Sequence, residues 1–220
     1  MSKRPVQHSF SSVTLFETCP KKFWHLRIRK DVKDSQSSVG EYGQEAHKHF
    51  EHRLMKGKRL PMDLQHHEKV LKPLADAPGE GMPEQKLAIN RSFEPTGFFD
   101  EDVWLRAIID YVKLKDDRAV IIDHKFGKRK EGFDQIELCT AVFACYRPEV
   151  TQYTGAFYWA KEKKFTRTKI TPSDIPAIWE KFTARFERVE HAVAHDEFPA
   201  KPNGLCKNYC PVKSCPHNGH

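Results

Sequence analysis

Two aspartates and a lysine stand close together in the central part of the chain. Asp110 and Asp123 each follow a pair of isoleucines, and Lys125 lies two residues beyond Asp123. Carboxylate oxygens are the ligands that Mg²⁺ and Mn²⁺ prefer, and an ammonium group can position an attacking water or offset negative charge. A single D-x-K pattern is more often a charged strand end than a reaction centre. The predicted elements around the D-x-K pattern are therefore needed to distinguish a reaction centre from a charged strand end.

The segment that carries these residues has the pattern of a β-hairpin. Two runs rich in β-branched residues, 107–112 and 119–122, flank the polar turn 113–118. Alternation along a strand places Asp123 and Lys125 on the same face. We therefore expect two carboxylates and one ammonium group to converge at one end of a sheet.

A histidine and a glutamine lie on helices predicted on either side of the hairpin. Apolar residues at four-residue steps predict a helix over 39–56, in which His47 lies one helical step before Glu51. An isolated histidine is usually an ordinary surface or core residue. Gln135 begins a second predicted helix, 133–146, where it would orient a phosphate or the attacking water, or act as a capping residue.

Charged residues outside the hairpin are weaker candidates. Lys128, Arg129 and Lys130 follow the D-x-K pattern directly. A charge run is usually a solvated loop, but this one lies where a phosphodiester backbone would approach Asp123. Glu84, at the start of a strand predicted over 84–93, is either a remote acidic contributor to the site or a solvated side chain.

The remaining elements complete an α/β pattern. Before the hairpin, we expect two short helices over 9–29 with a break at Cys19-Pro20, and a helix and loop over 60–81. After it, we expect strands over 150–160 and 165–171, with a possible bulge at Gly155 and a basic turn at 161–164. A helix with one apolar stripe follows over 174–195.

Three cysteines cluster in the polar C-terminal tail. Cys206, Cys210 and Cys215 are too poorly surrounded by apolar residues to be buried as hydrophobic side chains, and such clusters are typical of metal ligands outside oxidising compartments. Cys19 as the fourth ligand would give a tetrathiolate that holds an iron–sulfur cluster, whereas His217 would give a Cys₃His zinc site. The spacing alone does not distinguish the two metals, and free thiols on a disordered tail are the third alternative.

The composition is that of a basic globular protein. The 220 residues include 39% hydrophobic and 30% charged residues, with a mean hydropathy of −0.68, which suits one sizeable core. The net charge of +7 and the pI near 9.0 favour a polyanionic partner. No apolar run is as long as a membrane span, and residues 1–10 lack the apolar core of a secretory signal. We therefore expect a cytoplasmic protein without disulfides.

In combination, the motifs resemble those of the PD-(D/E)XK nuclease superfamily, in particular its RecB-like branch, which includes the CRISPR-associated adaptation nuclease. The matching residues are Gly43 to His47 in a G-x-x-x-H helix, Ile109-Asp110, Asp123-His124-Lys125 and Gln135. The branch usually has Q-x-x-x-Y in the last of these helices, and Cys139 stands here where the tyrosine would fall. The order and combination of the motifs are more specific than any one of them.

The resemblance implies an α/β fold with a restriction-endonuclease-like core, in which helices flank a central mixed sheet. It implies Asp110, Asp123, Lys125 and Gln135 as catalytic residues, and Mg²⁺ or Mn²⁺ as the metal. The implied metal ligands are His47, Asp110, Asp123 and the main-chain carbonyl of His124, and the implied nucleic-acid contacts come from Lys128, Arg129 and Lys130.

Several members of the branch carry an iron–sulfur cluster held by one cysteine before the core and three after it. Cys19 with Cys206, Cys210 and Cys215 is similar to that arrangement, although C-x₃-C-x₄-C differs from the commoner C-x₂-C-x₅-C. By resemblance we expect a [4Fe–4S] cluster, with Zn²⁺ as the alternative. Within a single domain over 1–220, segments 1–38 and 196–220 would form the cluster-binding subdomain and 39–195 the nuclease core.

The expected function is a metal-dependent DNA nuclease, with an exonuclease favoured over an endonuclease. It would act in recombination, repair or the processing of phage DNA, because the tail pattern C-P-V-K-x-C-P-H-N is similar to that of phage-encoded relatives. Its partner would be DNA, with possible proteins of a recombination or replication complex and no membrane. The main alternative is a non-catalytic nucleic-acid-binding scaffold with the same fold and cluster, and a weaker one is a zinc-bearing adaptor. Strand preference, polarity, RNA cleavage and oligomeric state stay open.

Overall fold

The computed structural model describes residues 6–34 and 38–219. The chain divides into two compact units, one made of residues 1–37 and 180–220 and the other of residues 38–179. All four cysteines of the predicted cluster belong to the first unit, and the hairpin with its two aspartates belongs to the second.

The second unit is built on a six-stranded mixed sheet. Its strands are β1 Glu80–Ile89, β2 Pro95–Thr96, β3 Leu105–Lys115, β4 Arg118–Lys125, β5 Gln152–Trp159 and β6 Lys164–Ile170, in the spatial order β2-β1-β3-β4-β5-β6. Neighbouring strands are antiparallel except β4 and β5, which are parallel and are joined through a helix. The predicted α/β class with a central mixed sheet is confirmed.

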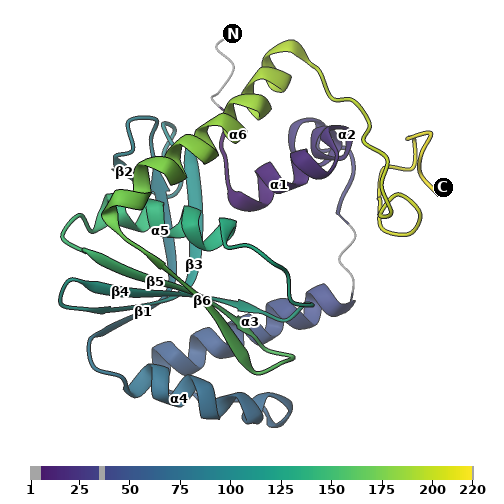
Figure 1. The fold of residues 1–220 in the computed structure, drawn as a ribbon. Helices are drawn as coiled ribbons and strands as arrows, with labels where there is room; N and C mark the ends of the chain where they lie inside the picture. The colour runs from purple at the N-terminus through teal and green to yellow at the C-terminus, as the bar shows by residue number, and fades with distance from the viewer. Residues whose placement is uncertain (1–5, 35–37, 220) are drawn as a thin grey trace. The chain divides into compact units, whose positions relative to one another are not determined.

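Helices cover both faces of this sheet (Figure 1). Helix α3 Ser38–Lys56, the 3₁₀ segment η2 Met62–His67 and α4 Glu68–Asp76 lie on one side, and α5 Asp134–Tyr146 lies on the other. On the α3 side, Phe50 and Leu71 pack with Tyr111, Ile122 and Tyr158 of the sheet in one buried cluster. Removing these apolar side chains from water is the main force that holds α3 and α4 on the sheet.

Helix α5 approaches the sheet closely at a glycine. A Cβ atom on Gly155 would lie 2.1 Å from Cγ2 of Ile136, so only glycine fits there. Gly155 pairs regularly with Ile121 on one side and Thr168 on the other. The predicted bulge at Gly155 is therefore wrong, because the glycine makes room for the helix and leaves the strand regular.

The first strand of the sheet begins and ends earlier than its sequence pattern indicates. The prediction placed it over 84–93, but β1 ends at Ile89. Asn90 then forms a turn in which its side-chain oxygen accepts hydrogen bonds from the main-chain N–H groups of Ser92 and Glu94. A side chain that bonds to its own backbone in this way ends the strand even though the apolar alternation continues.

The first unit consists of short helices, the later part of a long helix, and a tail. Its elements are α1 Phe10–Thr18, α2 Pro20–Phe23, the π-helix η1 Trp24–Arg29 and α6 Ile175–His195, which follows the 3₁₀ turn η3 Pro172–Asp174 and begins in the second unit. Ser9 caps α1 by a reciprocal hydrogen-bonded box with Ser12, and Pro20 starts α2, so the predicted break at Cys19-Pro20 is confirmed. The apolar stripe of α6 is also confirmed, since Phe182, Phe186 and Val189 are buried.

Within the described parts of the chain, no helix is both long enough and apolar enough to span a membrane.

Candidate active site

The two strands of the central hairpin separate where the predicted carboxylates stand. Pairing of β3 with β4 runs to Tyr111 opposite Ile122 and stops there. At the next position, Oδ2 of Asp110 accepts a hydrogen bond of 2.7 Å from the main-chain N–H of His124. The side chain of Asp110 thus bonds to β4 at the point where main-chain pairing of β3 with β4 ends.

Asp123 and Lys125 project from β4 toward the first turn of α5, as strand alternation predicts. Lys125 donates a hydrogen bond of 2.7 Å from Nζ to Oε1 of Gln135, and its Nζ lies 2.7 Å from Oδ2 of Asp123. The amide of Gln135 in turn donates to Oδ1 of Asp123. The three predicted residues therefore form one closed polar triangle, and each side chain restricts the rotamers of the other two.

The electrostatics of the two aspartates differ. Burial acts to raise the pKa of Asp110, but the hydrogen bonds and positive charge of His124 and His47 outweigh it, so the pKa of Asp110 lies far below its usual value. Burial and then the negative charge of Asp110 raise the pKa of Asp123 to about 6, although Lys125 opposes this. In the metal-free protein, Asp123 is therefore the carboxyl that takes up a proton first.

A candidate cation site is formed by His47, Asp110 and His124, which each offer a ligand atom within 4.8 Å of the others. Nδ1 of His47 lies 3.2 Å from Oδ2 of Asp110, and Nδ1 of His124 lies 3.5 Å from the same oxygen. Among the described residues, Nε2 of His124 is buried without a hydrogen-bond partner, whereas Oδ2 of Asp123 is buried against the ammonium group of Lys125. One carboxylate with two imidazoles, and a second carboxylate nearby, fits a divalent cation.

The ring of His47 is held by aromatic contacts. His47 lies on α3 and meets the ring of Phe126 edge-on, with 5.0 Å between the ring centres, and Phe126 also packs against Phe50 of the same helix. Gly43 lies against Phe126, with 3.7 Å between an ideal Cβ position and Cβ of Phe126. The predicted G-x-x-x-H pattern thus places one small residue and one imidazole over the residue that directly follows the D-x-K strand.

A further acidic pair lies beside this site and was only partly anticipated. In the register of β1 with β3, Glu84 lies opposite Asp110, between the pairs Pro83–Tyr111 and Gln85–Ile109; it is not itself paired, and its φ is positive at 43°. A hydrogen bond between the carboxyl groups of Glu51 and Glu84 raises the pKa of Glu51 and lowers the pKa of Glu84. The contact of Glu84 with α3 is one that alternation in the sequence does not reveal.

The comparisons with known proteins agree with this geometry. The family model described as PD-(D/E)XK nuclease superfamily matches residues 7–216, nearly the whole chain. The chain belongs to the PD-(D/E)XK nuclease superfamily. Its core has the mixed sheet and the D-x-K strand that the resemblance in the sequence implied.

Solved structures show the same fold at low sequence identity. The crystal structure of SSO0001 is 13% identical, with a TM-score of 0.51, and the match covers 99% of this chain and 90% of that one. A protein from Eubacterium rectale named "Putative exonuclease" is 12% identical, with a TM-score of 0.57 and coverage of 91% and 85%. Among curated proteins, none matches the sequence significantly.

The four cysteines of this PD-(D/E)XK protein line one small pocket in the first unit. Cys19, Cys206, Cys210 and Cys215 share it with the competing ligand His217. The main-chain N–H groups of Lys201 and Asn203 lie 3.5 Å and 3.4 Å from the sulfurs of Cys19 and Cys206, respectively. Donors aimed at sulfur are typical of the second shell around metal-bound thiolates. The donor set fits a thiolate-bound metal centre.

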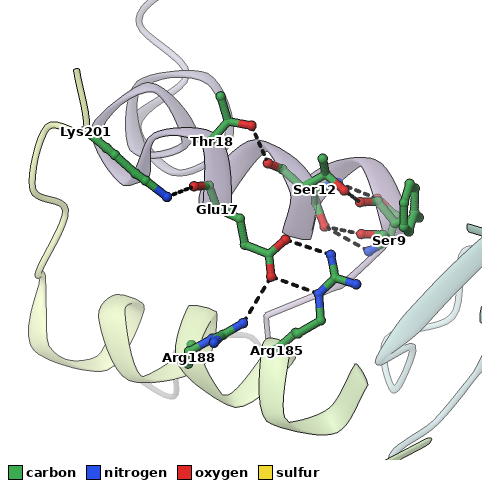
Figure 2. Close-up of polar contacts among 9 residues, drawn as sticks. Ser9, Ser12, Glu17, Thr18, Arg185, Arg188 and Lys201 are labelled. Atoms are coloured by element: carbon green, nitrogen blue, oxygen red, sulfur yellow. Dashed lines mark hydrogen bonds and ion pairs between the residues drawn. The ribbon is translucent and has the colours of Figure 1, made fainter. Parts of the chain in front are cut away.

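The segment around Cys19 is fixed by a polar network on α1 and α6 (Figure 2). Arg185 donates two hydrogen bonds, of 2.8 Å and 2.7 Å, to the carboxylate of Glu17, and Arg188 adds one of 3.1 Å. Lys201 donates from Nζ to the main-chain oxygen of Glu17 at 2.8 Å. One carboxylate thus joins the end of α1 to α6, and the tail is bonded to the same residue.

Three features of the site differ from or add to the expectations. The imidazole of His124 joins Asp110, although the sequence pointed only to its main-chain carbonyl. Cys139, in the place of the expected tyrosine, is buried, and burial followed by the charge of Asp123 raises the pKa of its thiol. The loop residues Lys128, Arg129 and Lys130 are exposed directly after β4, and their contact with nucleic acid stays a prediction.

Proposed function

We propose that this protein is a divalent-metal-dependent DNA nuclease, with exonuclease action favoured. The observation that carries the proposal is the closed triangle of Asp123, Lys125 and Gln135, placed on the strand next to Asp110. Burying an ion pair costs desolvation free energy. A non-catalytic DNA-binding scaffold has no need for this arrangement, whereas it is typical of sites whose charged groups take part in a reaction.

The site residues divide the work of phosphodiester hydrolysis. Asp110 and Asp123, with His47 and the main-chain carbonyl or imidazole of His124, would hold Mg²⁺ or Mn²⁺. Such a cation supplies Lewis acidity and lowers the pKa of a bound water. The histidine nitrogens suit Mn²⁺ better than Mg²⁺, which prefers oxygen.

Lys125 is the residue placed to act on the attacking water and on the developing charge. Its Nζ is held between Oε1 of Gln135 and Oδ2 of Asp123, so the ammonium group has a fixed position before substrate arrives. A preorganised cation stabilises the negative charge that accumulates on the phosphoryl oxygens, and it can orient water for in-line attack. Gln135 acts as the residue that positions Lys125 and Asp123.

The assignment to the RecB-like branch and to exonuclease action rests on sequence motifs and on one similar solved structure. The G-x-x-x-H helix, the I-D strand and the glutamine of α5 support the RecB-like branch, and the neighbour from Eubacterium rectale is named an exonuclease. We assign the protein to DNA processing in recombination, repair or phage replication, in the cytoplasm of its host. Proteins of such a complex are its expected partners.

We further propose that Cys19, Cys206, Cys210 and Cys215 hold a [4Fe–4S] cluster with a structural role. The shared pocket and the two N–H groups directed at sulfur support this proposal, and the resemblance to branch members with one cysteine before the core and three after it favours a cluster over Zn²⁺. On this view residues 1–38 and 196–220 serve the cluster, and residues 39–195 serve the chemistry.

Cleavage of end-labelled linear and closed circular DNA, single- and double-stranded, tests the proposed activity. Anaerobically purified protein is compared with Asp123→Ala in Mg²⁺, Mn²⁺ or EDTA. We expect metal-dependent loss of linear DNA only, absent in the variant, whereas cleavage of circles would make the protein an endonuclease. Full activity of Asp123→Ala would contradict the site, and tight DNA binding without any cleavage would support the scaffold alternative.

A further inference from the structure

A basic hollow lies beside the beginning of α5 and includes Arg129 and Lys130, two of the predicted nucleic-acid contacts. It is lined by the loop between β4 and α5 and by the edge strand β6, through Arg129, Lys130, Glu131, Phe133, Thr166 and Arg167. These six residues, called the β6 hollow below, carry three positive charges against one negative charge. Such a balance attracts a phosphate.

The β6 hollow is next to the catalytic lysine. Phe133 stacks on Phe157 with 5.8 Å between ring centres and 12° between ring planes. Nζ of Lys125 lies 5.4 Å from the centre of the ring of Phe157. In the sheet, Phe157 pairs with Asp123 on one side and with Thr166 on the other. The ring of Phe133 in the hollow therefore contacts the ring of Phe157, and Phe157 contacts the ammonium group of Lys125, which would act on the scissile phosphate.

Thr166 and Arg129 can bind a ligand at small cost, and the guanidinium group of Arg167 lies 4.7 Å from the centre of the Phe165 ring. Oγ1 of Thr166 accepts a hydrogen bond of 2.9 Å from the indole of Trp159, so its own hydroxyl hydrogen is available for an acceptor on a ligand. Arg129 contacts Glu162 at 4.0 Å, and both side chains are exposed. Exposed pairs of this kind contribute little stability, so a phosphate can replace the carboxylate.

Phe133 gives the hollow a second property. Its ring is half-buried and lines the hollow, while Phe157 stacks against it. Aromatic rings beside cations are typical of single-strand binding surfaces, because a base stacks on the ring while its phosphate meets the cations. Bases inside a duplex are already stacked on one another and do not present a free face.

We propose that the β6 hollow binds the nucleotide next to the scissile phosphate in an unpaired DNA strand, with the phosphate on Arg129, Lys130 and Arg167 and the base on Phe133. The proposal rests on the proposed nuclease function and narrows its substrate to DNA with a single-stranded segment at the site.

Fluorescence anisotropy in EDTA, with a short labelled single strand and the matching blunt duplex, tests this assignment without cleavage. Arg167→Ala removes a phosphate contact, and Phe133→Leu keeps apolar packing but removes the aromatic face. Lys169→Ala is the control, because Lys169 is an exposed cation on the same strand β6 that does not line the hollow. Circular dichroism confirms that each variant is folded.

We expect Arg167→Ala to weaken single-strand binding and to reduce the salt dependence by about 0.7 in the log–log slope. Phe133→Leu should weaken single-strand binding roughly tenfold and leave duplex binding unchanged. If both variants bind like Lys169→Ala while the wild type cleaves DNA with metal, the hollow is wrongly assigned and the nuclease function stands. If the wild type neither binds nor cleaves DNA, both proposals are wrong.

Discussion

The sheet-end site and the cysteine pocket are built in opposite ways. Asp110, Asp123 and Gln135 lie on strands or a helix of the second unit, and hydrogen bonds to main-chain and side-chain groups fix them without a metal. The three cysteines of the tail lie outside helices and strands, and Val212 is the one buried residue among those described after His195. The first site is preorganised by the fold, whereas on the proposed assignment the second gains its order from the metal that its sulfurs bind.

Because of this difference, the first site should matter mainly for the reaction and the second mainly for stability. A preorganised site can lose a functional group and stay folded, because the apolar core of the sheet holds its elements. A segment that buries little apolar surface gains its order from its ligand, as metal-bound small domains do. Substitutions in the first region should therefore change the cleavage rate, and substitutions in the second should change the stability of the tail.

The largest expected effect is on cleavage. Lys125→Met removes the ammonium group but retains most of the apolar length of the side chain. Loss of a preorganised donor should lower the cleavage rate by roughly 10²- to 10³-fold or more, with little change in the melting temperature. Single-turnover cleavage and thermal unfolding measure the two effects. A variant that unfolds at much lower temperature would contradict the separation of reaction from stability.

The next largest effect is on the first unit. Cys210→Ser should lose most of the bound iron and make residues 196–219 susceptible to limited proteolysis, because the tail buries little else. Iron analysis, visible absorption and proteolysis measure this. Cys145→Ser is the matched control, since Cys145 donates only to the main-chain oxygen of Ala141 on α5, which a serine hydroxyl can replace. Equal iron content in both variants would contradict the assignment of the ligands.

The smallest expected effect is an increase in stability when the negative charge of Asp123 is removed. Because the pKa of Asp123 is raised to about 6 in the folded protein, its protonated form is favoured there, and this contribution to stability is lost as the pH rises through 6. Asp123→Asn mimics the neutral form. In EDTA it should raise the free energy of unfolding by about 1–2 kcal/mol at pH 7.5 and by little near pH 4.

Urea unfolding at the two pH values measures this difference. Mn²⁺ should reverse the order at pH 7.5, because the cation stabilises only the protein that retains the carboxylate. If Asp123→Asn is less stable than the wild type in EDTA at pH 7.5, the negative charge of Asp123 does not destabilise the metal-free protein.

Local patterns in the sequence predicted most of the elements that carry the site. Apolar periodicity gave α3 with His47 and α5 with Gln135, and the β-branched runs gave the hairpin with Asp123 and Lys125 on one face. These properties depend on neighbours within one or two turns or strands, which is why a single sequence reveals them.

Features that arise between distant segments could not be predicted in the same way. The imidazole of His124 should lie away from Asp123 by alternation, and it meets Asp110 only because β3 and β4 separate at this point. The hydrogen bond between Glu84 and Glu51 joins β1 to α3. The β6 hollow combines a loop with an edge strand more than thirty residues later. Each depends on tertiary packing that local propensity does not encode.

The measurement that tests the central claim most directly is Mn²⁺ binding, followed by calorimetry and compared with Mn²⁺-dependent cleavage of single-stranded DNA. Asp110→Asn keeps an acceptor for the N–H of His124 but removes the charge, and Asp117→Asn in the turn of the same hairpin is the control. We expect Asp110→Asn to lose Mn²⁺ binding and cleavage together, while Asp117→Asn retains both. Unchanged Mn²⁺ binding and cleavage in Asp110→Asn would contradict it.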